Sequence, residues 1–415
     1  MQPLKAVLPV LLTTTCLFST AEHKPVAAQT ARSESSPTGA PATATASVKR
    51  SQFGKINVAG VSIENLNQTE ATRRLTRELA PKLNALYALT DGRRYEKRKR
   101  RDLGAQLDIA RMLTRAGRGD AYVPMLLKVD EAQLRRALRR VAPLFAREMK
   151  SARVVYYRGK VTIAPEQNKQ RLNIGGSAVR IAQTVEKNPG VKALPLALYT
   201  RTPQLTAARL KGIDGVLATY STPFNASNVK RTNNMRIAIK EIDGRLLSPG
   251  EVFSLNGTVG ERTQARGYRT TIIFQNGYKV PGIGGGVSQV TGTLFNAALE
   301  AGLDILTYRT HSQPVKYISL GRDATVAWGG FDMKFKNNTK APVYISYKVG
   351  DRVTATLFGK KQPGRKVAVR VVSKNIGPRE IKAQLYRTIR QNGKVVTKER
   401  IGSSHYKWNV GAWEE

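Results

Sequence analysis

The spacing of apolar residues predicts several helices and strands in this chain. Met235, Ala238, Ile239 and Ile242 recur at helical spacing, and Gly244 would end that helix. A second helix is expected from residue 290 to 303, where the apolar positions are Val290, Leu294, Ala297, Ala298 and Ala301. Beyond about residue 350 the pattern is strand-like, and Asn392-Gly393 predicts a type I′ hairpin turn. The fold class is therefore α+β, with a β-rich C-terminal part.

The N-terminal half contains two similar stretches. The segment from Gly54 to Ala59 resembles the segment from Gly159 to Ala164, about 105 residues later, and helical spacing follows both. Asn67 with Glu70 predicts a capping box at the start of the first helix. We expect a duplicated strand-turn-helix unit between residues 51 and 213.

The first fifty residues have a different composition. Residues 1–28 have the charge and apolar pattern of a signal peptide, although an uncleaved leader would also serve as a membrane anchor. Residues 29–50 are rich in Ser, Thr, Ala and Pro, which is typical of a disordered linker. The sequence thus predicts an exported protein of the cell envelope or the extracellular space.

Charge and cysteine content limit the partners. The 69 Lys and Arg residues exceed the 29 Asp and Glu residues, so the formal net charge is +40. Outside the cytoplasmic membrane such a surface attracts anionic wall polymers or lipid headgroups, and export makes nucleic acid an unlikely partner. Cys16 is the only cysteine, so a chain cut after it has no disulfide and no thiol nucleophile.

A glycine-rich loop precedes the helix expected at residue 290. Gly284, Gly285 and Gly286 are followed by Ser288 and Gln289. The free backbone amides and positive dipole end of a helix start hold anions. Three readings of Ser288 stay open: a helix cap, part of an anion or carboxylate site, or a nucleophile.

Ser288, His311 and Asp323 are the candidate catalytic residues. A serine nucleophile needs a histidine base, and His311 is the only histidine between the leader and the C-terminal tail. The alternatives are a structural histidine at a strand start and a turn carboxylate paired with Arg322 or Arg309. The spacing matches no zinc motif, and no motif predicts a cofactor.

Arg262 and Tyr268 are further candidates for ligand binding. A guanidinium close to the glycine loop could hold a carboxylate through two hydrogen bonds. Together with Phe253 and Asn256, these two residues could line a groove for a glycan or a peptide, although Phe253 would also suit the core. The three glycines and Gln289 are the other candidates for ligand binding.

Several motifs in order resemble the VanW family of vancomycin-resistance gene clusters. They lie at Pro249 to Asn256, Val259 to Arg262, Gly267-Tyr268, Gly284 to Leu294, His311-Ser312 and Gly321 to Val326. Many members of the family carry Cys where this chain has Ser288. The resemblance therefore does not imply a thiol enzyme here, because this chain lacks the thiol. Residues 53–213 resemble the peptidoglycan-binding domain that commonly precedes VanW-like and L,D-transpeptidase domains.

These features divide the chain into five parts. They are a signal peptide (1–28), a linker (29–50), a peptidoglycan-binding region with two repeat units (51–213), a VanW-like domain (214–350) and a β-rich extension (351–415). We expect a cell-envelope protein that binds peptidoglycan or wall peptides in wall assembly or maintenance. The alternative is a Ser-His-Asp acyl-transfer enzyme, a hydrolase or transpeptidase, acting on peptidoglycan peptides.

Overall fold

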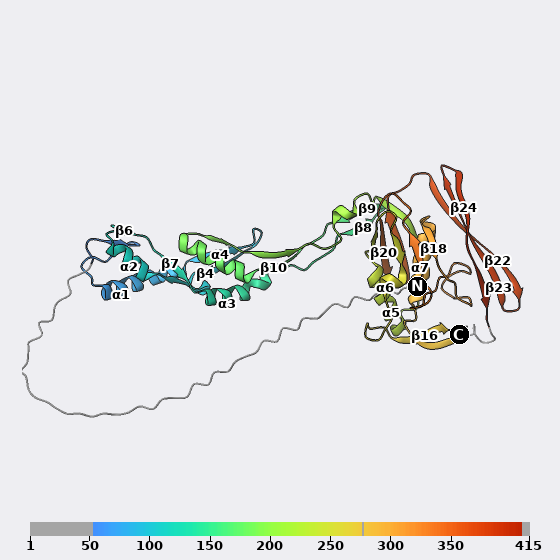
Figure 1. The fold of residues 1–415 in the computed structure, drawn as a ribbon, viewed down its shortest axis with the longest axis horizontal. Helices are drawn as coiled ribbons and strands as arrows, with labels where there is room; N and C mark the ends of the chain where they lie inside the picture. The colour runs from blue at the N-terminus through green and yellow to red at the C-terminus, as the bar shows by residue number, and fades with distance from the viewer. Residues whose placement is uncertain (1–52, 276–277, 409–415) are drawn as a thin grey trace, which may run out of the picture. The chain divides into compact units, whose positions relative to one another are not determined.

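The structure is a computed structural model that describes residues 53–275 and 278–408 (Figure 1). The expected signal peptide and linker lie outside these residues. The fold is mixed α+β with a β-rich C-terminus, which confirms the predicted class. None of the helices in the described part of the chain is long and apolar enough to cross a bilayer.

The first part of the N-terminal region packs two helices against a small sheet. Strand β1 (Asn57–Val58) lies between β2 (Val61–Ser62) and β6 (Tyr122–Val123). Helices α1 (Gln68–Leu79) and α2 (Ile109–Gly117) cover a core that includes Phe53, Val58, Ile63, Leu75 and Met112.

A second core forms between residues 83 and 198. Its strands are β3 (Leu86–Thr90), β4 (Tyr95–Lys99), β5 (Ala105–Leu107), β7 (Leu127–Val129), β10 (Lys169–Leu172), β11 (Ala193–Pro195) and β12 (Leu198–Arg201). Helices α3 (Glu131–Val141) and α4 (Ile174–Lys187) pack against them. The hairpin of β8 (Arg153–Tyr157) and β9 (Lys160–Ala164) precedes β10.

The two predicted repeat units share their order but not their strand pairing. The capping box of Asn67 and Glu70 is present, and Asn173 accepts a hydrogen bond from the Gly176 amide at the start of α4. Strand β1 pairs with β2 and β6, whereas β9 pairs only with β8 among the described strands. The likeness is therefore local.

The central region is built on a four-stranded sheet in the order β13 (Gly215–Pro223), β21 (Arg352–Gly359), β20 (Val343–Val349) and β14 (Leu246–Leu247). Helices α5 (Val229–Ile242) and α7 (Val287–Glu300) pack on it and on each other. As expected, α5 buries Met235, Ala238, Ile239 and Ile242. The expected boundary at residue 350 falls inside this sheet, because β20 and β21 are paired.

Smaller elements surround the start of α7. Strand β19 (Lys334–Lys336) lies between β15 (Val252–Ser254) and β18 (Asp304–Thr307), and the short helix α6 (Leu255–Val259) follows β15. Strands β16 (Thr270–Gln275) and β17 (Tyr278–Ile283) form a hairpin that leads into the glycine loop.

The C-terminal strands β22 (Arg365–Gly377), β23 (Glu380–Gln391) and β24 (Lys394–Lys407) form an antiparallel sheet. Asn392 and Gly393 have φ angles of 50° and 82°, which fit the predicted type I′ turn. Leu385 of β23 belongs to the same hydrophobic core as α5 and α7. The residues beyond 350 are therefore packed into the central region rather than separate from it.

Candidate functional site

The glycine loop and the start of α7 border a cavity of about 630 Å³. Its other walls come from the β16–β17 hairpin, from His311 and Tyr317, and from residues 325–328 and 331. Among the predicted site residues, it is lined by Gly284, Gly285, Gly286, Ser288, Gln289, Arg262 and His311.

Gly286 is the N-cap of α7 and has a φ of 105°, in the left-handed region that favours glycine. A Cβ here would lie 2.8 Å from Cγ of Met235 and 3.0 Å from Cγ of Arg231, so α5 packs directly against the loop. Asn234 of α5 secures the same loop by donating to the carbonyls of Arg269 and Gly285. The close contact requires glycine for both conformation and space.

Ser288 does not cap α7, so the capping interpretation is wrong. The helix begins at Val287 with Gly286 as its N-cap, which places Ser288 in the first turn. Its hydroxyl instead pairs with the Thr325 hydroxyl at 3.1 Å. The left-handed glycine starts the helix earlier than a serine cap would have done.

The start of α7 keeps unused donors. The Val287 amide donates to the Gly284 carbonyl at 3.2 Å, but the amides of Gly285, Gly286 and Ser288 bond to nothing within residues 53–275 and 278–408. Such amides and the positive helix end favour a bound anion.

Gln289 has a structural role in α7. Its side-chain amide donates to the Thr222 hydroxyl at 3.0 Å and to the Pro223 carbonyl at 2.7 Å. Those bonds tie the helix to the end of β13. The donors of its side chain are used within the protein, although the residue borders the cavity.

Arg262 and Arg231 bring positive charge to the cavity wall. Burial lowers the pKa of both guanidinium groups. Tyr317 partly offsets this effect at Arg231, and Tyr268 and the Asp332 carboxylate partly offset it at Arg262. Arg262 donates to the Gly260 carbonyl, while its Nη2 atom is buried without a hydrogen-bond partner. Arg231 lies over the Tyr317 ring, with Cζ 5.9 Å from the ring centroid.

Neither arginine forms an ion pair with a carboxylate in the described ranges. Glu261 also lines the cavity, but it is exposed and pairs with neither of them. The cavity therefore holds two partly desolvated cations beside a positive helix end. Arg231 was not predicted as a site residue from the sequence, although it shares the helical face of Met235, Ala238 and Ile242.

His311 and Asp323 form a buried pair, with 7% and 2% of their surfaces exposed. Oδ2 of Asp323 lies 2.7 Å from Nδ1 of His311 and also accepts the His311 backbone amide at 2.7 Å. Asp323 pairs with neither Arg322 nor Arg309. Arg322 contacts Glu300 instead, so the predicted association of His311 with Asp323 is present while the alternative pairing is not.

Ser288 and His311 border the same cavity without hydrogen bonding to each other. A histidine held through Nδ1 by a carboxylate presents Nε2 for proton transfer, which is the arrangement of a general base. The nucleophile-to-base contact of a closed triad is absent in this geometry. The Ser288 hydroxyl is paired with Thr325 instead.

Tyr268 is fully buried in the hydrophobic core and does not line the cavity. Burial raises the pKa of its phenol, and the nearby Arg266 and Arg262 partly oppose that effect. Its contribution to the site is indirect, because it packs beneath the segment that carries Arg262.

Part of the cavity lining is formed by large apolar side chains that are partly exposed. Ile272, Phe274, Trp328 and Phe331 line the cavity with 58%, 39%, 52% and 41% of their surfaces accessible. The Phe274 ring meets the His311 ring edge-on, with centroids 6.0 Å apart. A ligand in this cavity would thus meet both cations and apolar side chains. In the described part of the chain no cluster of three His, Cys, Asp or Glu residues could hold a metal ion.

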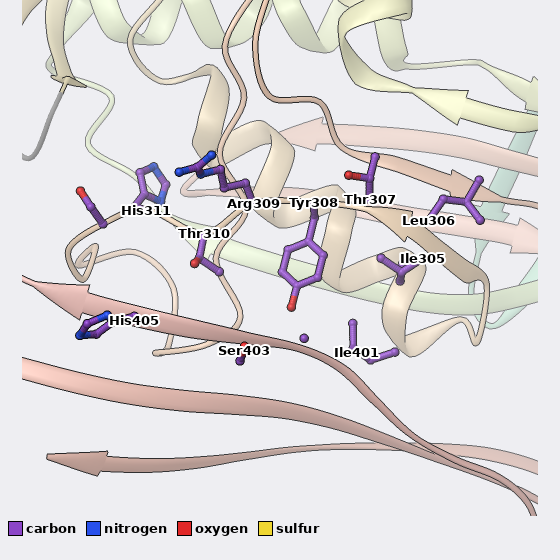
Figure 2. A pocket seen from close by; sticks show the side chains of 12 residues that line it. Ile305, Leu306, Thr307, Tyr308, Arg309, Thr310, His311, Ile401, Ser403 and His405 are labelled. Atoms are coloured by element: carbon purple, nitrogen blue, oxygen red, sulfur yellow. The ribbon is translucent and has the colours of Figure 1, made fainter. Parts of the chain in front are cut away.

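A second cavity of about 550 Å³ borders the chain segment that carries His311. Figure 2 shows Tyr308 directed from this segment toward β24, which carries Ser403 and His405. Gly402 makes this approach possible, because a Cβ there would lie 2.3 Å from the Tyr308 hydroxyl. The C-terminal sheet therefore reaches the immediate surroundings of His311.

The part of the chain that carries this site is similar to known proteins. Residues 230–358 match the family model of VanW like protein. The uncharacterized protein YoaR of Bacillus subtilis is 43% identical over 143 residues, which are 34% of this chain and 47% of YoaR. The vancomycin B-type resistance protein VanW of Enterococcus faecalis is 28% identical over 189 residues, which are 44% of this chain and 63% of that protein.

The matches thus span about half to just under two thirds of these relatives. No solved structure is significantly similar to the chain. The peptidoglycan-binding character of residues 51–213 stays a prediction. The matched segment contains the glycine loop, α7, His311 and Asp323, and it identifies residues 230–358 as a VanW-like domain.

Proposed function

We propose that this is an exported cell-envelope protein whose VanW-like domain binds peptidoglycan peptides through a carboxylate, in wall assembly or maintenance. The observation that carries the proposal is the pair Arg231 and Arg262, which lie partly desolvated in one cavity and form no ion pair with a carboxylate among the described residues, although the Asp332 charge acts on Arg262. Their position beside the unused amides of α7 gives one ligand group several donors.

The energetic argument rests on the cost of burying charge. A guanidinium removed from water without a counter-ion destabilises the folded protein, unless a ligand supplies the opposite charge. Bidentate bonds from arginine to a carboxylate are among the stronger hydrogen bonds in proteins. The apolar wall of Phe274 and Trp328 would hold the uncharged part of a peptide.

The N-terminal region has a different proposed role. Arg136, Arg139 and Arg140 lie exposed on α3, and the chain as a whole is strongly basic. We assign to this region a salt-sensitive attraction to anionic wall polymers or lipid headgroups. The name of the Enterococcus relative as a resistance protein agrees with a cell-envelope role.

Calorimetric titration of the chain from residue 29 onward with a purified muropeptide tests this proposal. Arg262→Met should weaken binding, whereas the matched change Arg139→Met on exposed α3 should leave it unchanged at physiological salt. Equal affinity of the wild type and Arg262→Met, with both folded, would show that the cavity is not the peptide-binding site.

The pair of His311 and Asp323 supports a second candidate, acyl transfer on wall peptides with Ser288 as the nucleophile. Muropeptide turnover would be followed in the wild type, Ser288→Ala, His311→Gln and the double variant. An enzyme requires that each single change abolish turnover and that the double variant be no worse, because triad members act as a unit. Retained turnover in folded Ser288→Ala would exclude this mechanism.

A further inference from the structure

Strand β24 lies outside the segment that matches the family, yet it contacts Asp323. Tyr406 of β24 is fully buried, and its hydroxyl donates to Oδ1 of Asp323. The same hydroxyl accepts the backbone amide of Gly321 at 2.6 Å. One side chain of the C-terminal sheet therefore holds both the carboxylate and the turn that precedes it.

Both oxygens of Asp323 are occupied. Oδ2 is hydrogen-bonded to the ring nitrogen Nδ1 and the backbone amide of His311, and Oδ1 accepts a hydrogen bond from the Tyr406 hydroxyl. A carboxylate bonded at only one oxygen can rotate about its Cβ–Cγ bond, whereas bonds at both oxygens fix its plane. Tyr406 thus determines how Oδ2 is presented to His311.

Tyr406 remains a proton donor at physiological pH. Burial raises the pKa of its phenol above the ordinary value, and the neighbouring Asp323 charge raises it further. An ionised Asp323 can only accept hydrogen bonds, so the proton between the two groups belongs to the tyrosine.

The sheet that carries Tyr406 is firmly fixed to the VanW-like domain. Arg387 of β23 is 2% exposed and donates to the carbonyls of Leu299 and Leu303, at the end of α7. A cation at a helix C-terminus is favourable because it opposes the helix dipole. Nearby, the Lys407 amide donates to the Ser312 carbonyl at 2.8 Å.

Glycines permit the close packing of these two parts. A Cβ on Gly321 would lie 3.1 Å from Cγ1 of Val371, and one on Gly302 would lie 2.8 Å from Nη2 of Arg365. A side chain at either position would require Val371 or the end of Arg365 to move, and both glycines have a positive φ that disfavours other residues. The C-terminal sheet is fitted to the site from which Asp323 projects.

We propose that Tyr406 is a positioning residue that acts through Asp323 to keep the proton of neutral His311 on Nδ1. Nε2 is then the unprotonated ring nitrogen, and within the described residues it makes no hydrogen bond. The tautomer sets whether Nε2 accepts or donates toward a ligand in the cavity. This consequence rests on the proposed function, whereas the positioning itself does not.

The test is the tautomer of His311 in Tyr406→Phe, read from the ¹⁵N chemical shifts of its ring at neutral pH without ligand. In the wild type the shifts should be those of the Nδ1–H form. Tyr406→Phe should move them toward a mixture of the two forms, and Asp323→Asn provides the reference for loss of the carboxylate. Wild-type shifts in folded Tyr406→Phe would overturn the proposal.

Tyr308→Phe is the matched control. The Tyr308 hydroxyl is also buried close to His311, but it has no hydrogen-bond partner in the described part of the chain, so its removal should leave the ring shifts unchanged. If Tyr406→Phe does not fold, the wild type still decides, because a bonded Tyr406 hydroxyl should give a slowly exchanging proton resonance. Its absence would contradict the proposal. Since no ligand is present, failure here is distinct from failure of peptide binding.

Discussion

The buried charge of Asp91 in the N-terminal region and the buried charges of Arg231 and Arg262 in the VanW-like domain have opposite surroundings. In the N-terminal region the buried carboxylate of Asp91 accepts the amides of Arg93 and Arg94 and pairs with the Arg94 guanidinium. In the VanW-like domain the partly buried Arg231 and Arg262 form no ion pair with a carboxylate of the described residues, and only the Asp332 charge partly offsets the burial of Arg262. A charge that the fold neutralises supports structure, whereas a charge left without its counter-ion points to a ligand.

The largest expected effect comes from removing the charges without partners. Arg231→Met and Arg262→Met should each weaken muropeptide binding about 10- to 100-fold, since a hydrogen bond to a charged group contributes about 1.5–3 kcal/mol. The free energy of unfolding should stay the same or rise, because an uncompensated buried charge is lost. Titration and urea unfolding of the same samples measure both. A drop in stability without a drop in affinity would show that the two arginines support the fold rather than bind the peptide.

Asp91→Asn should lower the free energy of unfolding without changing peptide affinity. Burial alone would raise the Asp91 pKa, but hydrogen bonds from the Arg94 and Arg93 amides and from the side chains of Arg94 and Gln170 lower it to about 2. Because the folded-state pKa lies below the ordinary value, the stabilisation is present above about pH 4 and disappears as the pH falls toward 2. The variant should lose about 2 kcal/mol of unfolding free energy at pH 7, with unchanged peptide affinity.

Urea unfolding between pH 7 and pH 2 measures this effect. The stability difference between the wild type and Asp91→Asn should shrink as the pH falls through this range. A constant difference at all pH values would show that the charge of Asp91 is not what stabilises the N-terminal region.

Ser288→Ala tests how much the contact between Ser288 of α7 and Thr325 stabilises the protein. The change removes the hydroxyl contact with Thr325 but no cap, so we expect a loss of about 1 kcal/mol. Thr325→Val removes the same contact from the other side, and the double variant should lose little more than either single. Thermal melts of the three variants provide the measurement. Additive losses would mean that the two hydroxyls stabilise the protein independently.

The smallest effect is expected on the exposed face of α3. Changing Arg136, Arg139 and Arg140 to Gln should alter the unfolding free energy by less than about 0.5 kcal/mol per site. Cosedimentation with purified cell-wall sacculi should fall at low salt and match the wild type at high salt, because exposed charges are screened. Unchanged cosedimentation at low salt would remove α3 from the proposed wall contact.

Local patterns predicted the local structure of this protein. Helical spacing located α5, the Asn67 and Glu70 pair gave a true capping box, and Asn392-Gly393 gave the hairpin turn. Each depends on residues that are close in sequence, where backbone geometry alone decides the outcome. The association of His311 with Asp323, 12 positions apart, was within reach of the same approach.

Contacts between distant segments were not predictable in this way. Strand β13 pairs with β21, so the sheet joins residues near 215 to residues near 359. Tyr406 likewise contacts Asp323, which lies 83 positions earlier in the sequence. Tyr268 resembled a groove residue because its motif lies near Arg262, yet its ring is buried in the core. Serine is a preferred cap, and only the left-handed conformation of Gly286 revealed that the helix begins before Ser288.

The central claim is that the cavity holds a carboxylate. The most direct measurement compares two forms of one muropeptide, with its C-terminal carboxylate free or converted to the amide, in calorimetric titrations of the wild-type chain. We predict that the amide binds about tenfold or more weakly, and that Arg262→Met binds both forms with similarly low affinity. Equal binding of the two forms by the wild type would contradict the account.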